Sequence, residues 1–239
     1  MIDQTQLIKE LKEQEITISK DQADMMDRFV MLLIEWNRKI NLTSILEPDQ
    51  IVTKHLVDSL LLVPLIPNDS KKMIDIGAGG GFPSVPISIL YPELEVVQAD
   101  SLQKRIRFLE EVKEKLSLST RPIAIRAEEA GKREEFREQF DVVIARAVAN
   151  LAVLSEYALP LTQVGGRFIP LKGPAGLEEL SASRGVIREL GGEIEQVKEC
   201  ILEDGSKRIL PIIKKISHTP TKYPRNTARI TKKPLFFPE

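Results

Sequence analysis

Residues 72–82, KMIDIGAGGGF, are the stretch that decides the fold. An apolar, strand-like run leads into four glycines, and an apolar helical pattern follows over residues 84–91. A glycine-rich turn between a strand and a helix lets the backbone approach a ligand closely, and the free N–H groups of the helix start face that ligand. The stretch therefore predicts a ligand-binding loop. The alternative is a glycine-rich turn without a ligand.

The spacing of the glycines separates the possible ligands. A dinucleotide fingerprint, G-x-G-x-x-G, needs a glycine where this chain has Phe82, or Ser84 when counted from Gly79. A phosphate loop needs a following Gly-Lys-Ser/Thr, which is absent. The pattern Asp-x-Gly-x-Gly-x-Gly starting at Asp75 resembles the first motif of class I S-adenosylmethionine-dependent methyltransferases. That resemblance implies that Gly77 and Gly79 line the methionine portion of S-adenosyl-L-methionine.

Strand-like and helical runs alternate from this loop onward. Strands are expected at residues 72–77, 93–100, 121–127, 140–147 and 165–172, each followed by a helix, and then a hairpin of 193–202 with 207–216. This order predicts an α/β, Rossmann-like fold with a mostly parallel seven-stranded sheet, helices on both faces and an antiparallel edge strand.

The segments outside the alternation have different patterns. Apolar spacing predicts a short helix near Leu7, an amphipathic helix over about 25–36 and a third from Pro48 to Leu62. The last segment has four prolines and little periodicity, which predicts an extended arm or loop. The chain is therefore divided into an N-terminal helical extension, a methyltransferase core and a basic C-terminal arm, at residues 1–68, 69–217 and 218–239.

Composition excludes several classes of protein. The chain has 239 residues, of which 42% are hydrophobic and 29% charged, as is ordinary for globular domains. No apolar run reaches the roughly 18 residues that cross a bilayer, and the N-terminus lacks the apolar block of a signal peptide. One cysteine, Cys200, and two distant histidines argue against a disulfide framework and against a metal site. A cytoplasmic protein, monomeric and without a metal or membrane partner, is expected.

Charge is distributed unevenly along the chain. From Lys207 onward there are nine bases and one acid, a net charge of +8, whereas the preceding 206 residues hold 25 bases and 34 acids, a net charge of −9. A basic end on an acidic body favours an anionic partner, nucleic acid first. A solvated tail of no consequence is the alternative.

Three later strand ends carry further candidate residues. Asp100 follows Gly77 by 23 residues and can accept hydrogen bonds from ribose hydroxyls, or cap the next helix. In the methyltransferase fold the region of Ala127 and Glu128 contacts adenine. Arg146 ends the fourth strand, where amine methyltransferases often have Asn/Asp-Pro-Pro-aromatic. A ring nitrogen such as guanine N7 loses no proton, so Arg146 is a candidate to orient the cofactor or to donate to guanine O6. Pairing with a core acid is its alternative.

Six separated motifs narrow the resemblance. They are WNRKINLT at 36–43, HLVDS at 55–59, the glycine loop with Phe82 and Pro83, DS at 100–101 with KR at 104–105, RA at 146–147, and LKG at 171–173. Together they resemble the RsmG family, formerly called the glucose-inhibited division protein B family, over about residues 5–239. This family methylates N7 of a guanosine in the decoding-region loop of 16S ribosomal RNA. One departure is that residues 226–229 lack the glycine expected after YPR at 223–225.

The resemblance implies particular site residues. The cofactor would contact Gly77, Phe82, Ala127, Glu128 and Arg146, with Arg146 as the catalytic residue. Candidates for RNA phosphate contacts are the basic residues Arg38, Lys104, Arg105, Lys172, Arg225, Lys232 and Lys233. The 16S RNA or the small ribosomal subunit is the implied partner. A helix-packing role is favoured for His55 and Asp58. Two other functions stay open: a small-molecule methyltransferase on the same fold, and a non-enzymatic RNA-binding assembly factor.

Overall fold

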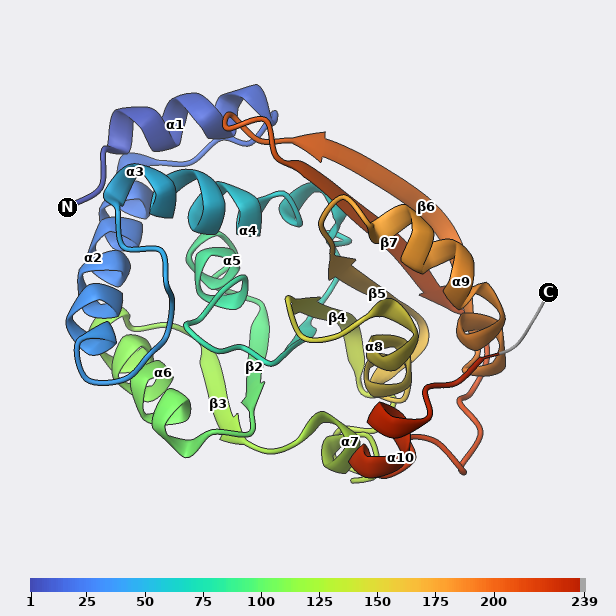
Figure 1. The fold of residues 1–239 in the computed structure, drawn as a ribbon. Coiled ribbons are helices and arrows are strands. Elements are labelled where there is room, and N and C mark those ends of the chain that lie inside the picture. The colour runs from blue at the N-terminus through green and yellow to red at the C-terminus, as the bar shows by residue number, and fades with distance from the viewer. Residues whose placement is uncertain (237–239) are drawn as a thin grey trace.

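A seven-stranded sheet forms the centre of the molecule, in the order β3-β2-β1-β4-β5-β7-β6 (Figure 1). The structure is a computed structural model that describes residues 1–236; residues 237–239, the end of the predicted arm, lie outside the described residues. The strands are β1 Lys72–Ile76, β2 Glu95–Asp100, β3 Thr120–Ala124, β4 Phe140–Arg146, β5 Thr162–Leu171, β6 Gly192–Ile201 and β7 Lys207–Lys215. Strands β1 to β5 pair in parallel, as the alternation of strands and helices predicted.

The position of the antiparallel strand differs from the prediction in one respect. Strand β7 is antiparallel to both β5 and β6, and it lies between them, so β6 forms the edge. After β5 the chain first forms the edge strand β6. It then turns back through the hairpin at Gly205 and forms β7 between β5 and β6. The fold class is confirmed, whereas the expected antiparallel strand lies one place in from the edge.

Two hydrophobic cores cover the two faces of the sheet. Because side chains alternate along a strand, Met73 and Val142 enter one core while Ile74 and Val143 enter the other. The first core packs the N-terminal helices α1 Gln4–Glu13 and α2 Lys20–Asn37 together with α5 Ser84–Leu90 and α6 Gln103–Leu116. The second core packs α7 Ala127–Ala130, α8 Leu151–Ala158, α9 Gly176–Glu189 and α10 Thr227–Lys232. The N-terminal helices thus share a core with the sheet.

The third predicted helix is present with an altered middle. Residues 48–60 run through α3 Pro48–Ile51, the π-helical turn η1 Val52–Val57 and α4 Asp58–Leu60, and the short 3₁₀ turn η2 Val63–Leu65 follows. π-Helical turns are rare and concentrate at functional sites. This one contains Lys54 and His55.

The arm is only partly extended, so that prediction was wrong for residues 227–232. They form α10, which begins because the Asn226 side chain accepts a hydrogen bond from the Arg229 N–H at 2.9 Å. Ile230 anchors the helix by full burial in the second core. An isolated six-residue helix would be unstable, so tertiary packing decides this one.

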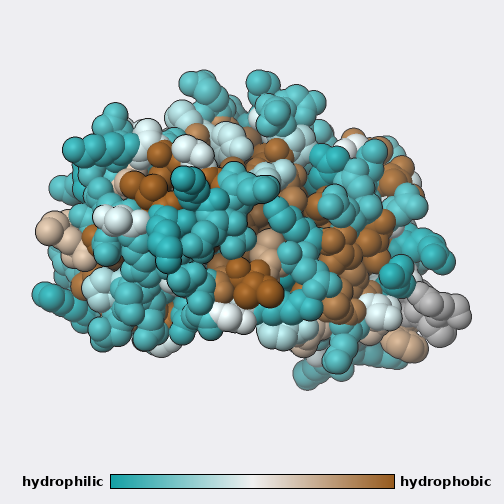
Figure 2. All heavy atoms as spheres, turned by 90° about the horizontal axis from the view of Figure 1, so that it is seen from above, coloured by the Kyte–Doolittle hydropathy of each residue, from teal (hydrophilic) through white to brown (hydrophobic). Residues whose placement is uncertain are grey.

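Seen from above, hydrophilic residues cover most of the visible face, and hydrophobic residues reach it in separate patches (Figure 2). Within residues 1–236 no helix is long and apolar enough to cross a membrane.

Candidate functional site

A cavity of about 300 Å³ lies at the carboxyl ends of β1, β2, β3 and β4. In open parallel sheets, ligands bind in the crevice at this edge. Five of the seven predicted cofactor residues line it, namely Gly77, Asp100, Ala127, Glu128 and Arg146. The other two contact lining residues: the Gly79 N–H donates to Asp100 at 3.0 Å, and the Phe82 ring lies 5.2 Å from the Arg146 guanidinium. The local spacing of strands and loops therefore brought most of the predicted residues together.

The glycine loop has the backbone conformation that glycines permit. Gly77, Gly79 and Gly81 have φ values of +74°, +54° and +85°. A Cβ on Gly81 would lie 2.7 Å from the Val85 side chain, so that position is closed. A Cβ on Gly79 would meet only the Gly77 carbonyl, at 3.6 Å. Gly79 thus leaves open space where a ligand can approach the backbone.

Asp100 connects the loop to the next strand. Its Oδ2 accepts hydrogen bonds from the Gly79 N–H at 3.0 Å and from Arg105 at 3.1 Å, and its Oδ1 accepts one from the Leu102 N–H at 2.9 Å. The carboxylate is 3% exposed and faces the cavity. Its hydrogen bond to Leu102 reaches the residue before α6 and not the N–H groups of the helix's first turn, so the alternative role as a helix cap was wrong. The carboxylate can still accept hydrogen bonds from a ligand in the cavity.

Asp75 is a buried acid directly before the glycine loop. Burial raises the pKa of its carboxyl to about 6. At normal hydrogen-bond geometry neither oxygen has a partner among the described residues. A buried carboxylate without a full set of donors favours a cationic or hydrogen-bonding ligand nearby.

The β3 side of the cavity is closed by the C-terminal arm. Glu128 is 7% exposed, and its Oε1 accepts a hydrogen bond from the Thr227 hydroxyl. Thr227 and Tyr157 both line the cavity. Burial raises the pKa of the Tyr157 hydroxyl, and the charges of Glu128 and Glu156 raise it further. The adenine end of the predicted site thus includes residues from α8 and α10.

A second cavity, of about 540 Å³, meets the first at Arg146 and Ala147. Ala147 has φ +54°, a conformation that costs energy for a residue with a side chain and that clusters at functional sites. Four cations line this cavity against two acids: Lys54, Arg146, Lys172 and Arg208 against Asp58 and Glu179. Its net charge of +2 suits an anionic ligand.

Arg146 is held by a buried acid, as its structural alternative predicted. Its guanidinium donates to Asp58 Oδ2 at 2.9 Å and to the Lys54 carbonyl at 3.1 Å. Asp58 Oδ1 accepts a second hydrogen bond from Arg208 at 2.5 Å. The Arg146 guanidinium also lies 5.2 Å from the centre of the Phe82 ring, within cation–π range. Arg146 nevertheless lines both cavities, so pairing with Asp58 fixes its direction without removing it from the site.

His55 completes this arrangement. Its ring stacks on Phe82 at 4.5 Å between centroids, and its Nε2 lies 2.7 Å from the Thr43 hydroxyl. Nδ1 lies 3.0 Å from the Lys54 carbonyl, which can only accept, and 3.2 Å from Arg146, which can only donate. Burial, and then the charge of Arg146, lower the pKa of His55 to about 4. The imidazole is therefore neutral near pH 7.

The predicted RNA contacts fall into two groups. Arg38, Lys104, Lys232 and Lys233 are exposed. Three others form ion pairs: Arg105 with Asp100 at 3.1 Å, Lys172 with Glu179 at 2.7 Å, and Arg225 with the buried Glu156 at 2.6 Å. RNA contact remains a prediction for all seven residues. The paired ones have a structural role in addition.

Several site residues were missed at the level of sequence. Asn37 closes the loop at residues 42–43, where its Oδ1 accepts hydrogen bonds from the Leu42 N–H at 2.7 Å and the Thr43 N–H at 2.9 Å. This places Thr43 against His55. Both Asn37 and Thr43 belong to the motif at 36–43, which contributed to the family resemblance but did not indicate what these two residues do. Arg208 and Thr227 gave no signal, because their partners lie far away in the chain. Within residues 1–236, no group of three or more His, Cys, Asp or Glu side chains could hold a metal ion.

The strand order and the cavity at the strand ends define the fold of class I methyltransferases. The branched-chain polyamine synthase C9 mutein from Thermus thermophilus shares the fold with a TM-score of 0.58 at 13% identity, over 80% of this chain and 64% of that chain. P. horikoshii TYW2 in complex with MeSAdo gives a TM-score of 0.53 at 14% identity, over 66% of this chain and 61% of that one. This chain thus spans less than two thirds of either structure, and the likeness concerns the fold alone.

Sequence comparison identifies the family. The family model described as rRNA small subunit methyltransferase G matches residues 22–209. Ribosomal RNA small subunit methyltransferase G of Clostridium novyi (strain NT) is 46% identical over 207 residues, which are 85% of each chain. The chain belongs to the rRNA small subunit methyltransferase G family, and the resemblance stated from its six motifs is confirmed.

Proposed function

We propose that the protein transfers a methyl group from S-adenosyl-L-methionine to N7 of a guanosine in the decoding-region loop of 16S ribosomal RNA. Family membership supports methylation of small-subunit ribosomal RNA. The observation that carries the finer proposal is the meeting of two cavities at Arg146, one below the glycine loop and one with net positive charge. The first would hold the cofactor and the second the nucleotide.

The cofactor-side residues fit S-adenosyl-L-methionine. The open space above Gly79 admits a ligand close to the backbone, and the Asp75 carboxylate offers buried acceptors near the loop. Asp100 can accept hydrogen bonds from ribose hydroxyls, and Ala127 and Glu128 lie where adenine would be read. When bound, the cofactor supplies an electrophilic methyl group on a sulfonium centre.

The second cavity favours an acceptor that loses no proton. His55 has a pKa of about 4 and has both ring nitrogens engaged, and Asp58 is held by two arginines. His55 is a poor general base near neutral pH, since an effective base needs a pKa near the operating pH, and both Asp58 oxygens already accept hydrogen bonds from arginines. Guanine N7 has an in-plane lone pair and no proton, so this site needs only to position it.

Arg146 is the residue that would do this positioning. Its guanidinium lies at the junction of the cavities and is fixed by Asp58, the Lys54 carbonyl and the Phe82 ring. A fixed guanidinium can donate to guanine O6 beside N7. Orientation of the two reactants then supplies most of the rate enhancement.

The RNA would bind by its phosphates to the exposed bases around this edge. The exposed side chains of Arg38, Lys104, Lys232 and Lys233 can reach them directly, whereas Lys172 at the mouth of the second cavity would exchange Glu179 for phosphate. A guanosine unstacked from its loop would enter the cavity. The proposal includes a monomer that acts in the cytoplasm on the RNA or on the small subunit.

The test is to incubate the protein with small ribosomal subunits, and separately with naked 16S RNA, and isotope-labelled cofactor, and to identify the modified base. N7-methylguanosine at one position supports the proposal. A label on an exocyclic amine or a ribose would overturn it. At saturating cofactor, which removes any effect of Asp75 on cofactor binding, the single-turnover rate should also be flat between about pH 5.5 and 7.5, because His55 in the second cavity has a pKa of about 4. A log-linear rise with pH would exclude N7 as the acceptor.

A further inference from the structure

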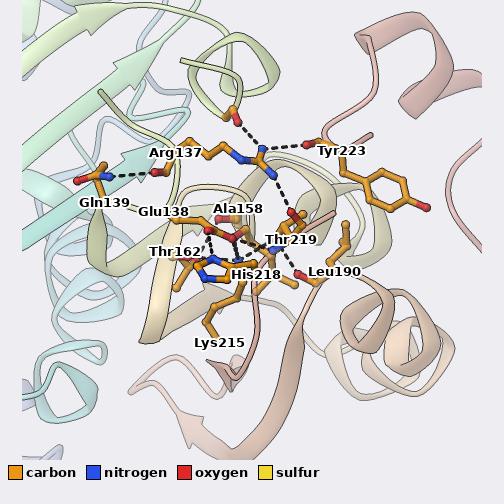
Figure 3. A network of polar contacts seen from close by, with 12 residues as sticks. Arg137, Glu138, Gln139, Ala158, Thr162, Leu190, Lys215, His218, Thr219 and Tyr223 are labelled. Atoms are coloured by element: carbon orange, nitrogen blue, oxygen red, sulfur yellow. Dashed lines mark hydrogen bonds and ion pairs between the residues drawn. The ribbon is translucent and has the colours of Figure 1, made fainter. Parts of the chain in front are cut away.

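The C-terminal arm is fastened to the core at its root. Lys215 is fully buried, and its ammonium donates to Glu138 at 3.0 Å, to the Thr219 hydroxyl at 2.7 Å and to the Leu159 carbonyl at 2.5 Å (Figure 3). Arg137 donates to the carbonyls of Thr219 at 2.8 Å and Tyr223 at 2.9 Å. Buried polar groups with satisfied partners specify one conformation. The path of residues 215–223 is therefore fixed.

A second fastening lies closer to the cofactor-side cavity. Arg225 forms a bidentate pair with Glu156, at 2.8 and 2.6 Å, and its backbone N–H donates to the same carboxylate at 2.9 Å. The Glu156 side chain is fully buried. Two residues later the arm reaches Thr227, and Ile230 enters the core. Both sides of Thr227 are thus anchored.

The anchored arm brings one hydroxyl to the cavity wall. Thr227 lines the cavity, and its hydroxyl donates to Glu128 Oε1. An ionised carboxylate has about four acceptor sites, so Oε2 stays able to accept a hydrogen bond from a ligand. Without the Thr227 hydroxyl, the Glu128 side chain would be free to change rotamer until a ligand binds. Ordering that side chain on binding costs free energy and weakens affinity for the ligand.

We propose that Thr227 is a positioning residue for the cofactor: it holds Glu128 so that the free oxygen accepts a hydrogen bond from the adenine 6-amino group. The inference rests on the proposed function and deepens it, since it makes the C-terminal arm part of the cofactor site. The arm then has two roles, because the exposed Lys232 and Lys233 belong to the RNA-binding candidates.

Three variants of the full chain test this role by calorimetry with S-adenosylhomocysteine. Thr227→Val removes the hydroxyl at nearly constant shape and should weaken affinity by roughly fivefold to tenfold, which is within the range for the net contribution of one ordinary hydrogen bond. Thr227→Ser keeps the hydroxyl and should stay within about twofold of the wild type. Thr221→Val makes the same change elsewhere in the arm at an exposed site, and it should leave affinity unchanged.

A second ligand separates positioning from a general loosening of the arm. S-inosylhomocysteine has an oxo group in place of the 6-amino donor, so the wild type should bind it more weakly than S-adenosylhomocysteine. In Thr227→Val the ratio of the affinities for S-adenosylhomocysteine and S-inosylhomocysteine should be smaller than in the wild type. It should fall by the same factor as the affinity for S-adenosylhomocysteine. Equal affinities of wild type and Thr227→Val, or an unchanged preference, would overturn the inference alone. Failure of the wild type to bind S-adenosylhomocysteine would overturn the proposed function and the inference together.

Discussion

The two cavities that meet at Arg146 are built in different ways. The cofactor-side cavity is a product of backbone: the N–H groups of Gly77 and Ala78 both donate to the Ala99 carbonyl, at 2.8 and 3.1 Å, and the walls are consecutive strand ends. The second cavity is a product of side chains: Asp58 joins Arg146 and Arg208, which lie 88 and 150 residues further along the chain. The first should therefore be sensitive to backbone crowding, and the second to removal of single charges.

The largest effect is expected from crowding the glycine loop. Gly79→Val places a branched side chain in the open space and should weaken S-adenosylhomocysteine binding by more than about 100-fold, because overpacking costs up to about 3 kcal/mol. Gly165→Val is the matched control, since Gly165 also has a positive φ, +93°, with nothing near its added Cβ. Unchanged affinity in a folded Gly79→Val variant would show that the cofactor does not bind at this loop.

The next largest effect should come from the residue that both cavities share. Arg146→Ala should lower the single-turnover methylation rate by about 100-fold, the cost of misplacing a reactant by about 1 Å, with a smaller change in cofactor affinity. Arg121→Ala, at an exposed arginine paired with Glu135, provides the control. A wild-type rate for Arg146→Ala would place the catalytic role elsewhere.

Asp58 tests whether side-chain charges hold the second cavity together. Asp58→Asn replaces one acceptor oxygen by a donor that faces an arginine, and it should lower the rate roughly 30-fold through Arg146. Stability should fall as well, since two partly buried guanidinium groups lose their counter-charge. Asp49→Asn, at an exposed site near the start of the same helical segment, should have the wild-type rate. If the two variants behave alike, Arg146 does not depend on Asp58.

His55 gives a pH signature to the same cavity. Its pKa is about 4 when folded and about 6.5 when unfolded, so the unfolded chain binds the proton first and stability falls as the pH drops through this window. Relative to His55→Gln, the free energy of unfolding of the wild type should fall by about 1 kcal/mol when the pH is lowered from 6.5 to 5.5, as measured by urea unfolding. Asp75, with its raised pKa of about 6, makes the opposite contribution, because its protonation on acidification stabilises the folded state. Both proteins contain Asp75, so its contribution cancels in the comparison. Parallel pH profiles would show that His55 is not buried as described.

The smallest effect is expected outside both cavities. Neutralising Lys232 and Lys233 together should weaken RNA binding, and the slope of log K against log salt should become shallower by about one unit for each phosphate that is no longer neutralised. The double change Lys113→Gln and Lys115→Gln, also at exposed lysines, serves as the control. An unaltered slope in the Lys232 and Lys233 variant would take the arm out of the RNA interface.

The cofactor-side cavity was largely predictable because its determinants are local. The Asp75–Gly81 spacing, the strand before it and the position of Asp100 all follow from residues within 30 of one another. Strand and helix periodicity fixes which ends meet at one edge of a parallel sheet, so Gly77, Asp100 and Glu128 had to converge. Family motifs added Arg146 at the junction.

Contacts between distant segments could not be predicted in the same way. Nothing in the spacing shows that Arg208 reaches Asp58, that Thr227 reaches Glu128, or that β7 lies inside β6 rather than at the edge. These contacts depend on how whole layers pack, and the free energy that selects them comes from burial and ion pairing across the fold. The sequence by itself therefore determined the fold class and the glycine loop, and it predicted the class of ligand. Only the tertiary structure decided which charges hold Arg146 and which part of the arm closes the cofactor cavity.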